Sequence, residues 1–353
     1  MQHLPLALLA LAACTPTDDT ADTQPTVDVC AEAGLPSSYD QVSADYLALE
    51  AATFALGDSV MDLFHAGDID AIWTMCSPDV QALVSKADLE SIYDQVFETA
   101  PVDQLIGRRS MGVGRGMYDA STWDWQGIVL AITWGFDAEG QLSALSINQA
   151  SDLPEPYPDY DSSVEFAFPL GCLVYTAWGG RDELHNYHTY YAPNAYAYDF
   201  IMWQQGGTCA EPCEANEDYW IFGQPLYAPA AGTVAEAEDG NPDMPPGEKD
   251  PPALEGNHVT IEVAPGEYLL MAHMQNGSVL VATGDTVERG QHIGNVGNSG
   301  NTTESHLHIH LQDQVVYGAQ AESMPQDFYG IMVDGEDVAR GMPAGSSFVV
   351  PGD

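Results

Sequence analysis

The sequence predicts two consecutive folded units, a small α+β unit followed by a larger unit that is mainly antiparallel β-sheet. Between residues 40 and 100, apolar residues recur at spacings of three and four, which is typical of amphipathic helices. After Gly107 the pattern changes to short apolar runs bounded by Gly, Pro, Asn and Asp, which is typical of strands and turns. The chain has 353 residues, 45% of them hydrophobic, and is therefore long enough for two cores.

Residues 1–13 are predicted to be an export signal. The run from Leu4 to Ala13 is apolar but too short to span a bilayer as a stable helix. It ends in Leu11-Ala12-Ala13-Cys14, which resembles a bacterial lipobox, a signal that is cleaved before its Cys. The resemblance implies a lipid on Cys14, although the first three residues lack the usual Lys or Arg. The alternative is an ordinary secretory signal cut near Ala13, and both interpretations place the protein outside the cytoplasm.

Residues 14–37 are predicted to be a flexible acidic tether that begins with the lipidated Cys. Thr, Asp, Pro and Ser dominate this segment after Cys14, and apolar residues are sparse. A tether of this length suffices to hold a domain off a membrane without fixing its orientation.

Residues 38–150 are predicted to form the α+β accessory domain, which begins with helices. A first helix ends at Ala66-Gly67-Asp68, and the next begins with the run from Ile69 to Met75. Ser85 followed three residues later by Asp88 is close to a capping box, which indicates a helix that runs through Phe97.

Strands follow these helices. They are expected at Trp125–Phe136 and Leu142–Ile147, joined by a turn at residues 137–140. Helices followed by strands are typical of a small α+β domain. The pattern resembles the NTF2-like and cystatin-like folds, without a diagnostic motif, and it contains no catalytic constellation.

Residues 151–163 are predicted to be a Pro-rich and acidic linker, and residues 164–353 to be the β unit with a C-terminal extension. Residues 239–254 are expected to form an exposed loop between two strands. The expected strands are 164–168, 196–203, 232–237, 258–263, 267–273, 290–297 and 305–311.

The charge of the chain restricts its partners. There are 53 Asp and Glu against 8 Lys and Arg, which gives a formal net charge of −45. Such a chain repels nucleic acid and anionic lipid, so both are excluded as partners, apart from a membrane reached through a lipid anchor. The charge argues for solubility and carries no information about the fold.

The segment Ser305–Leu311 alternates polar and apolar residues, which is typical of a half-buried strand. Residues two apart on a strand point to one face, so His306, His308 and His310 are expected to project side by side. Imidazoles arranged in this way can bind a transition metal, or can divide the roles of ligand and proton carrier. Three of the ten His residues fall within these five positions, which favours such a site over a polar strand face.

Several further segments accompany the histidine strand in a fixed order. Together they resemble the lysostaphin/LytM-type zinc metallopeptidases over residues 180–312. The matching pieces are a first His and an Asp, then Gly223–Val234, Tyr268–His273, Gly284–Gly300 and the His306-Leu307-His308 tripeptide. The resemblance implies a compact antiparallel β-sheet domain that holds one catalytic zinc ion in a groove.

The resemblance also implies a role for each site residue. His188, Asp199 and His308 would be the zinc ligands, because the family uses a His, an Asp and the second His of its H-x-H motif. His306 would be the general base on the zinc-bound water. His273 would stabilise the oxyanion or pass a proton to the leaving amine.

The sequence departs from the family pattern at two places. Many members space the first His and the Asp by four residues, whereas His188 and Asp199 are eleven apart; Asn186-Tyr187-His188 fits a variant with a longer insertion. His185 is a competing first ligand. Many members have Glu where this chain has His310, which either orients His308 or is a strand-face residue, and we favour the strand-face role.

The chain contains six Cys residues. Cys14 is assigned to the lipid anchor. Cys209 and Cys213 bracket a short loop, and in an oxidising compartment a disulfide is expected between them. A second metal site at this pair is the weaker alternative. Cys30, Cys76 and Cys172 are left over. Cys30 could pair with Cys76, but connectivity does not follow from sequence.

The resulting functional hypothesis is an exported, lipid-anchored zinc endopeptidase of the cell envelope. By resemblance, its substrates are peptidoglycan cross-bridge or stem peptides, hydrolysed by a zinc-activated water without a covalent intermediate. One alternative is a non-catalytic module of the same fold that binds cell wall or activates another hydrolase. Another is an exported lipoprotein in which zinc has a structural role.

Overall fold

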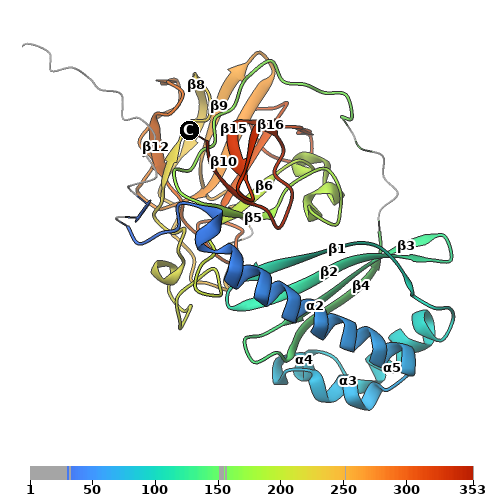
Figure 1. Cartoon of the computed structure of the whole chain (residues 1–353). Helices are drawn as coiled ribbons and strands as arrows, with labels where there is room; N and C mark the ends of the chain where they lie inside the picture. Colours follow the sequence, from blue (N-terminus) through green and yellow to red (C-terminus); the bar gives the residue numbers. More distant parts are fainter. Residues whose placement is uncertain (1–29, 32, 151–154, 156, 251, 353) are drawn as a thin grey trace, which may run out of the picture.

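The first unit consists of helices packed against one face of a four-stranded antiparallel sheet (Figure 1). The structure is a computed structural model that describes residues 30–352 except 32, 151–154, 156 and 251. The predicted signal peptide, Cys14 and the tether up to residue 29 lie outside the described residues. The elements are a 3-10 turn (Tyr39–Gln41), α2 (Ser43–Ala66), α3 (Ile69–Met75), α4 (Pro78–Leu83), α5 (Lys86–Ile92), a π-helical turn (Tyr93–Phe97), β1 (Gln104–Val113), β2 (Gly116–Trp125), β3 (Ile128–Phe136) and β4 (Leu142–Gln149).

The helix boundaries follow the local signals in the sequence. Gly67 ends α2 in the left-handed conformation, with φ of 67°, which favours glycine. The Asp68 side chain then accepts a hydrogen bond from the backbone of α3, and Ser85 with Asp88 forms the expected capping box of α5. Large apolar side chains of the helices and the sheet share one core: Phe64, Ile72, Leu89, Ile132 and Trp134 are fully buried.

The strand prediction for this unit was wrong in two respects. The expected strand Trp125–Phe136 is divided by a turn at Gln126 and Gly127, whose φ angles of 57° and 83° suit a tight hairpin. Strand β1 and most of β2 were not predicted. These strands carry charged residues that obscure the apolar alternation, for example Arg108, whose guanidinium is paired with the buried Asp119 carboxylate at 2.6 Å.

The second unit is built on an eleven-stranded sheet in the order β11-β8-β9-β10-β13-β6-β5-β17-β15-β16, with β14 also paired to β13. A separate two-stranded sheet joins β12 to β7. The named strands pair antiparallel, which confirms the mainly antiparallel β fold. Their bounds are β5 (Val174–Trp178), β6 (Tyr198–Ile201), β7 (Pro225–Tyr227), β8 (Gly232–Glu238), β9 (Asn257–Ala264), β10 (Glu267–Met274), β11 (Thr286–Val287), β12 (His292–Asn295), β13 (Leu307–Gln312), β14 (Ser323–Met324), β15 (Phe328–Val333), β16 (Glu336–Gly341) and β17 (Phe348–Pro351).

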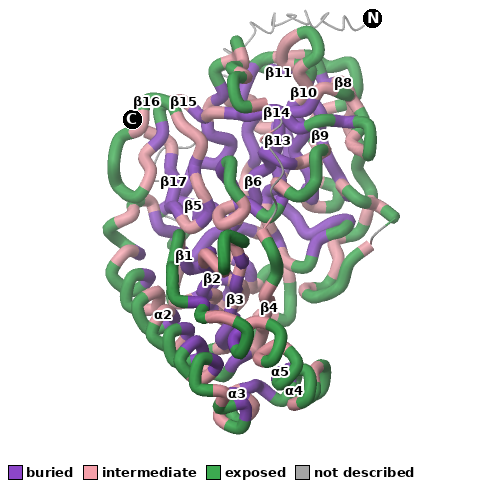
Figure 2. Tube along the Cα trace, turned by 90° about the vertical axis from the view of Figure 1, so that its right-hand side faces the viewer, coloured by how far each residue is buried: buried purple, intermediate pink, exposed green. Residues whose placement is uncertain are grey.

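Three features of this unit differ from the sequence prediction. Residues 164–168 form no strand, since only Phe166 makes a single bridge, to Phe328. Strand β5 and strands β14 to β17 were not predicted. Strand β13 is buried along its whole length and not half-buried, and it lies inside the sheet between β10 and β6 (Figure 2).

The two units share a core at their junction, where α2 begins beside β5 and runs along the four-stranded sheet (Figure 1). Tyr46 of α2 packs against Trp203 and is hydrogen-bonded to Tyr175 of β5, with 2.8 Å between the hydroxyl oxygens. A disulfide joins Cys30 to Cys172. The first unit is therefore fixed against the second, and the predicted domain boundaries stay a prediction. Among the described residues, no helix is both long and apolar enough to cross a membrane.

Candidate metal centre and catalytic cavity

Strand pairing brings the predicted site residues together although they are far apart in the sequence. In the register of β6 and β13, Asp199 lies directly opposite His308. On the other side of β13, His308 lies opposite Ala272, the residue before His273. His188 comes from the 3-10 helix Tyr187–Tyr190, which precedes β6.

One group of three possible ligands contains His188, Asp199 and His308, whose ligand atoms lie within 4.8 Å of one another. His308 Nδ1 is 2.8 Å from Asp199 Oδ1, and His188 Nε2 is 3.5 Å from Asp199 Oδ2. All three residues are buried, with exposed fractions of 1%, 7% and 8%. Two imidazoles and one carboxylate that converge in this way fit a catalytic zinc ion, which uses about three protein ligands and leaves one position open.

The His188 ring is oriented by a residue whose role sequence reasoning missed. Asn186 is fully buried, and its amide nitrogen donates to the carbonyls of Gly180, Ala195 and Ala197 at 3.0 to 3.3 Å. Its Oδ1 atom must therefore accept from His188 Nδ1, 2.9 Å away. This leaves the lone pair of His188 on Nε2, which faces Asp199. The sequence signal was the Asn-Tyr-His pattern itself.

A chain of hydrogen bonds orients His308 in a comparable way. The Gln312 amide nitrogen donates to the Val315 carbonyl at 3.2 Å, so its Oε1 atom accepts from His310 Nε2 at 2.9 Å. His310 Nδ1 lies 3.0 Å from His308 Nε2, and the other ring nitrogen of His308, Nδ1, lies 2.8 Å from Asp199 Oδ1, so the ring is held between His310 and the carboxylate. His310 is fully buried within this chain, which differs from the strand-face role that we favoured.

His306 and His273 form a second possible ligand group with His308. The His306 Nδ1 atom is 2.9 Å from the Glu304 carbonyl, and its Nε2 atom is 3.6 Å from Asp199 Oδ1. His273 Nδ1 is 2.9 Å from the Ser299 carbonyl. The rings of His273 and His306 are 4.8 Å apart.

The backbone at His273 has an unusual conformation, with φ of 60°. This left-handed region is costly for a residue other than Gly, and it persists only where the surrounding structure holds it. It coincides with an irregularity in the pairing of β9 and β10 between Met271 and Met274. The irregularity aims the His273 ring at the site.

Burial favours the neutral form of three imidazoles near the site, those of His188, His273 and His310. Burial is the largest cause that lowers the pKa of His188, to about 3, and burial also lowers the pKa values of His273 and His310 well below their ordinary value. For Asp199, burial alone would raise the pKa, but the neighbouring rings, above all His188 and His306, hold it below its ordinary value. Neutral imidazole and ionised carboxylate are the forms that bind a metal ion.

A cavity of about 320 Å³ opens beside these residues. Besides the site residues, its lining includes Trp178, Tyr187, Lys249, Glu304 and Tyr317 from the second unit, and Val113 from the first unit. The competing ligand His185 is not part of this lining, and its ring is paired with Asp182, with 2.8 Å between Nδ1 and Oδ1. The alternative first ligand therefore lies outside the group that converges on the cavity.

The cysteines have a definite arrangement. Cys209 and Cys213 are joined by a disulfide, and Cys30 is joined to Cys172. The pairing of Cys30 with Cys76 that the sequence left open does not occur, because Cys76 is buried as a free thiol in the first unit.

Comparisons with known proteins identify a family for part of the chain. Residues 220–320 match the model of peptidase family M23, a range that includes His273, His306 and His308 but neither His188 nor Asp199. No curated protein matches the chain.

Several solved structures are similar to it. The catalytic domain of the antimicrobial peptidase lysostaphin from Staphylococcus simulans is 22% identical, with 37% of this chain and 74% of that chain covered and a TM-score of 0.25. A zinc-containing peptidase from Vibrio cholerae is 15% identical, with coverages of 59% and 55% and a TM-score of 0.28. A putative peptidase M23 from Pseudomonas aeruginosa is 18% identical, with coverages of 52% and 67% and a TM-score of 0.28.

The chain spans about half the length of the Vibrio cholerae peptidase, and TM-scores of this size carry no argument about function. The family match agrees with the order of the motifs in the sequence. Residues 220–320 of the second unit therefore resemble peptidase family M23, as the order of the motifs in this part of the chain indicated.

Proposed function

We propose that the protein is an exported, zinc-dependent endopeptidase that hydrolyses peptide bonds, with peptidoglycan peptides as its substrates. The observation that carries the proposal is the convergence of two imidazoles and one carboxylate, from His188, Asp199 and His308, beside a cavity that all three residues line. When bound, zinc would keep a net positive charge beside this set, and that charge lowers the pKa of a bound water and polarises a scissile carbonyl.

His306 is suited to remove the proton from the attacking water. The Glu304 carbonyl can only accept a hydrogen bond, so His306 Nδ1 donates to it at 2.9 Å. The lone pair is then on Nε2, on the side of the ring that faces Asp199 at 3.6 Å. A general base needs this lone pair beside the reacting atoms.

His273 is suited to the transfer of a proton toward the leaving amine. Its Nδ1 atom donates to the Ser299 carbonyl, so the neutral ring presents a lone pair on Nε2. A ring in this form can donate to an oxyanion only after it has gained a proton. The ring centroids of His273 and His306 are 4.8 Å apart, and this proximity supports a proton transfer that involves both rings, so we favour the proton-transfer role over direct stabilisation of the oxyanion.

The extracytoplasmic location and the lipid anchor on Cys14 belong to the same proposal. They rest on the N-terminal sequence, since Cys14 lies outside the described residues. The two disulfides support the proposal because disulfides persist in oxidising compartments.

The test combines zinc content with the loss of turbidity of a cell-wall suspension. We expect the purified protein to contain about one zinc ion and to lyse the suspension. His306→Ala should keep its zinc and lose activity about 100-fold or more, whereas His188→Ala should lose both. His292→Ala is a matched control, because His292 bonds Asn295 and does not line the cavity.

The outcomes separate the proposal from its alternatives. Bound zinc without cleavage of cell wall or of a peptide mixture would favour a structural or binding module. Equal lysis by the parent protein and by His306→Ala would show that His306 is not the general base.

A further inference from the structure

The tip of the hairpin formed by β1 and β2 reaches from the first unit to the catalytic cavity of the second. Val113, the last residue of β1, lines the cavity. The next residue, Gly114, donates its backbone N–H to Glu304 Oε2 at 3.3 Å, two residues before His306. A segment outside the M23 match thus contacts the loop that leads into the histidine strand.

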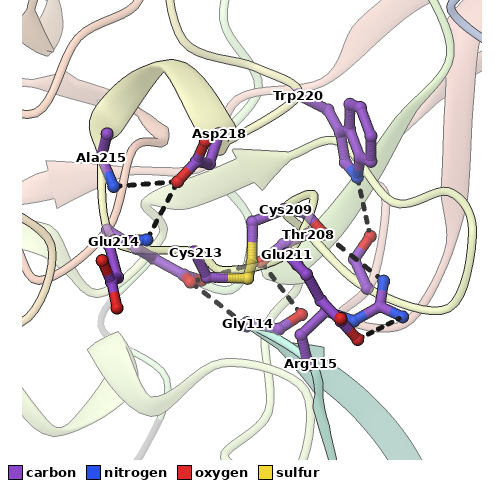
Figure 3. Close-up of a disulfide and its surroundings, with 12 residues drawn as sticks. Gly114, Arg115, Thr208, Cys209, Glu211, Cys213, Glu214, Ala215, Asp218 and Trp220 are labelled. Atoms are coloured by element: carbon purple, nitrogen blue, oxygen red, sulfur yellow. Dashed lines mark hydrogen bonds and ion pairs between the residues drawn. A yellow bond between two sulfur atoms is a disulfide. The ribbon is translucent and has the colours of Figure 1, made fainter.

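The segment that leads into the Cys209–Cys213 disulfide, residues 205–209, holds this hairpin tip in place (Figure 3). The Gly114 carbonyl accepts the backbone N–H of Thr208 at 2.8 Å. The Arg115 guanidinium donates to the Gln205 carbonyl at 2.8 Å and to the Cys209 carbonyl at 3.4 Å. The backbones approach so closely that a Cβ atom on Gly207 would lie 2.6 Å from the Gly114 carbonyl oxygen.

The strand residues next to the tip are also fixed, because they belong to the core shared by the two units. Met111 and Met117, on the two strands of the hairpin, pack in one buried cluster with Tyr175 and Trp203. Gly112 lies against Trp203, since a Cβ atom there would meet the indole ring at 2.9 Å. A hairpin end anchored at its tip and at the adjoining strand residues has no room to act as a lid.

We propose that this hairpin tip is a permanent wall of the substrate cavity, and that Val113 limits the size of the substrate side chain that fits beside the catalytic histidines. The inference rests on the proposed function. It assigns the first unit a part in substrate selection, because a residue outside the M23 match would set the side-chain size that one substrate position accepts.

Peptide binding tests the proposal without relying on turnover. The full-length, zinc-loaded protein carries His306→Ala in every variant, so that bound peptide is not cleaved. The probes are fluorescent pentaglycine and four pentaglycines in which one of the inner or C-terminal residues is replaced by Phe. Dissociation constants are compared for the protein with Val113 unchanged and for its Val113→Ala and Val113→Trp variants, with Ile128→Ala and Ile128→Trp as controls. Ile128 begins β3, is 36% exposed and does not line the cavity.

The quantity compared is the ratio of the dissociation constant of a Phe-containing peptide to that of pentaglycine. For at least one Phe position, Val113→Ala should lower this ratio about tenfold, the usual effect of a methylene or two in an apolar pocket. Val113→Trp should raise the same ratio by a similar factor, and the Ile128 variants should leave it unchanged. Zinc content should be the same throughout. An unchanged ratio in Val113→Ala, or no binding of any peptide, would overturn the inference. Lack of lysis by the wild-type protein would instead count against the proposed function.

Discussion

Glu304 should make the metal-free protein less stable as the pH rises. Its carboxylate accepts from the Gly114 backbone N–H at 3.3 Å and from the Thr208 hydroxyl at 3.4 Å. Burial nevertheless raises the pKa of Glu304 from 4.5 to about 7. Between these pH values the folded protein holds a proton that the unfolded chain has released. The free energy of unfolding therefore falls as the pH rises from 4.5 to about 7, and the full penalty applies above that range.

The size of the penalty follows from the two pKa values. A pKa difference of this size corresponds to roughly 3 kcal/mol, at about 1.4 kcal/mol for each unit. Because the Glu304 side chain borders the cavity and is partly exposed to water, we expect about 2 kcal/mol after solvent screening. A bound metal ion would lower the pKa by its charge, so the effect belongs to the metal-free protein.

The Glu304→Gln variant measures this penalty. The amide keeps a carbonyl oxygen for Gly114 and Thr208, but it cannot ionise. We expect the variant and the parent to be equally stable near pH 4.5, and the variant to be about 2 kcal/mol more stable at pH 8.

The assay is urea unfolding of both proteins at several pH values after removal of metal with a chelator and with the disulfides intact. Glu98→Gln, on an exposed turn of the first unit, is the control. The reasoning would be refuted if the difference in the free energy of unfolding between Glu304→Gln and the parent stayed constant from pH 4.5 to pH 8.

Three further predictions concern the metal centre, the junction and the charge. Gln312→Leu removes the acceptor that orients His310, so zinc affinity in a competition titration should fall about 10- to 100-fold; unchanged affinity would show that the hydrogen-bond chain does not tune the ligand. Cys172→Ser removes the disulfide to Cys30 and should lower the free energy of unfolding by about 2–5 kcal/mol in a urea titration. If the free energy of unfolding fell only as much as for a Ser substitution at an exposed position, the disulfide would have no structural role. Lysis of cell wall should rise with moderate salt, because counter-ions screen a protein of net charge −45 from an anionic wall; a steady decrease with added salt would argue against this.

The sequence by itself determined the features that local pattern and motif order control. Glycine at the end of α2 and the capping box at Ser85 define helix boundaries, because these signals act within one turn of the chain. The alternation in β13 indicated which His side chains share a face. The ordered motifs from Gly223 to His308 indicated the peptidase family, and residues 220–320 match its model.

Only the tertiary structure decided which distant residues meet. His308 and Asp199 are 109 residues apart and lie opposite each other only because β13 pairs with β6. The partner of Cys30 and the burial of His310 likewise depend on contacts between distant segments, which a local pattern cannot encode. The contribution of Val113 to the cavity depends on how two units pack, because a side chain becomes part of a site only when the fold closes around it.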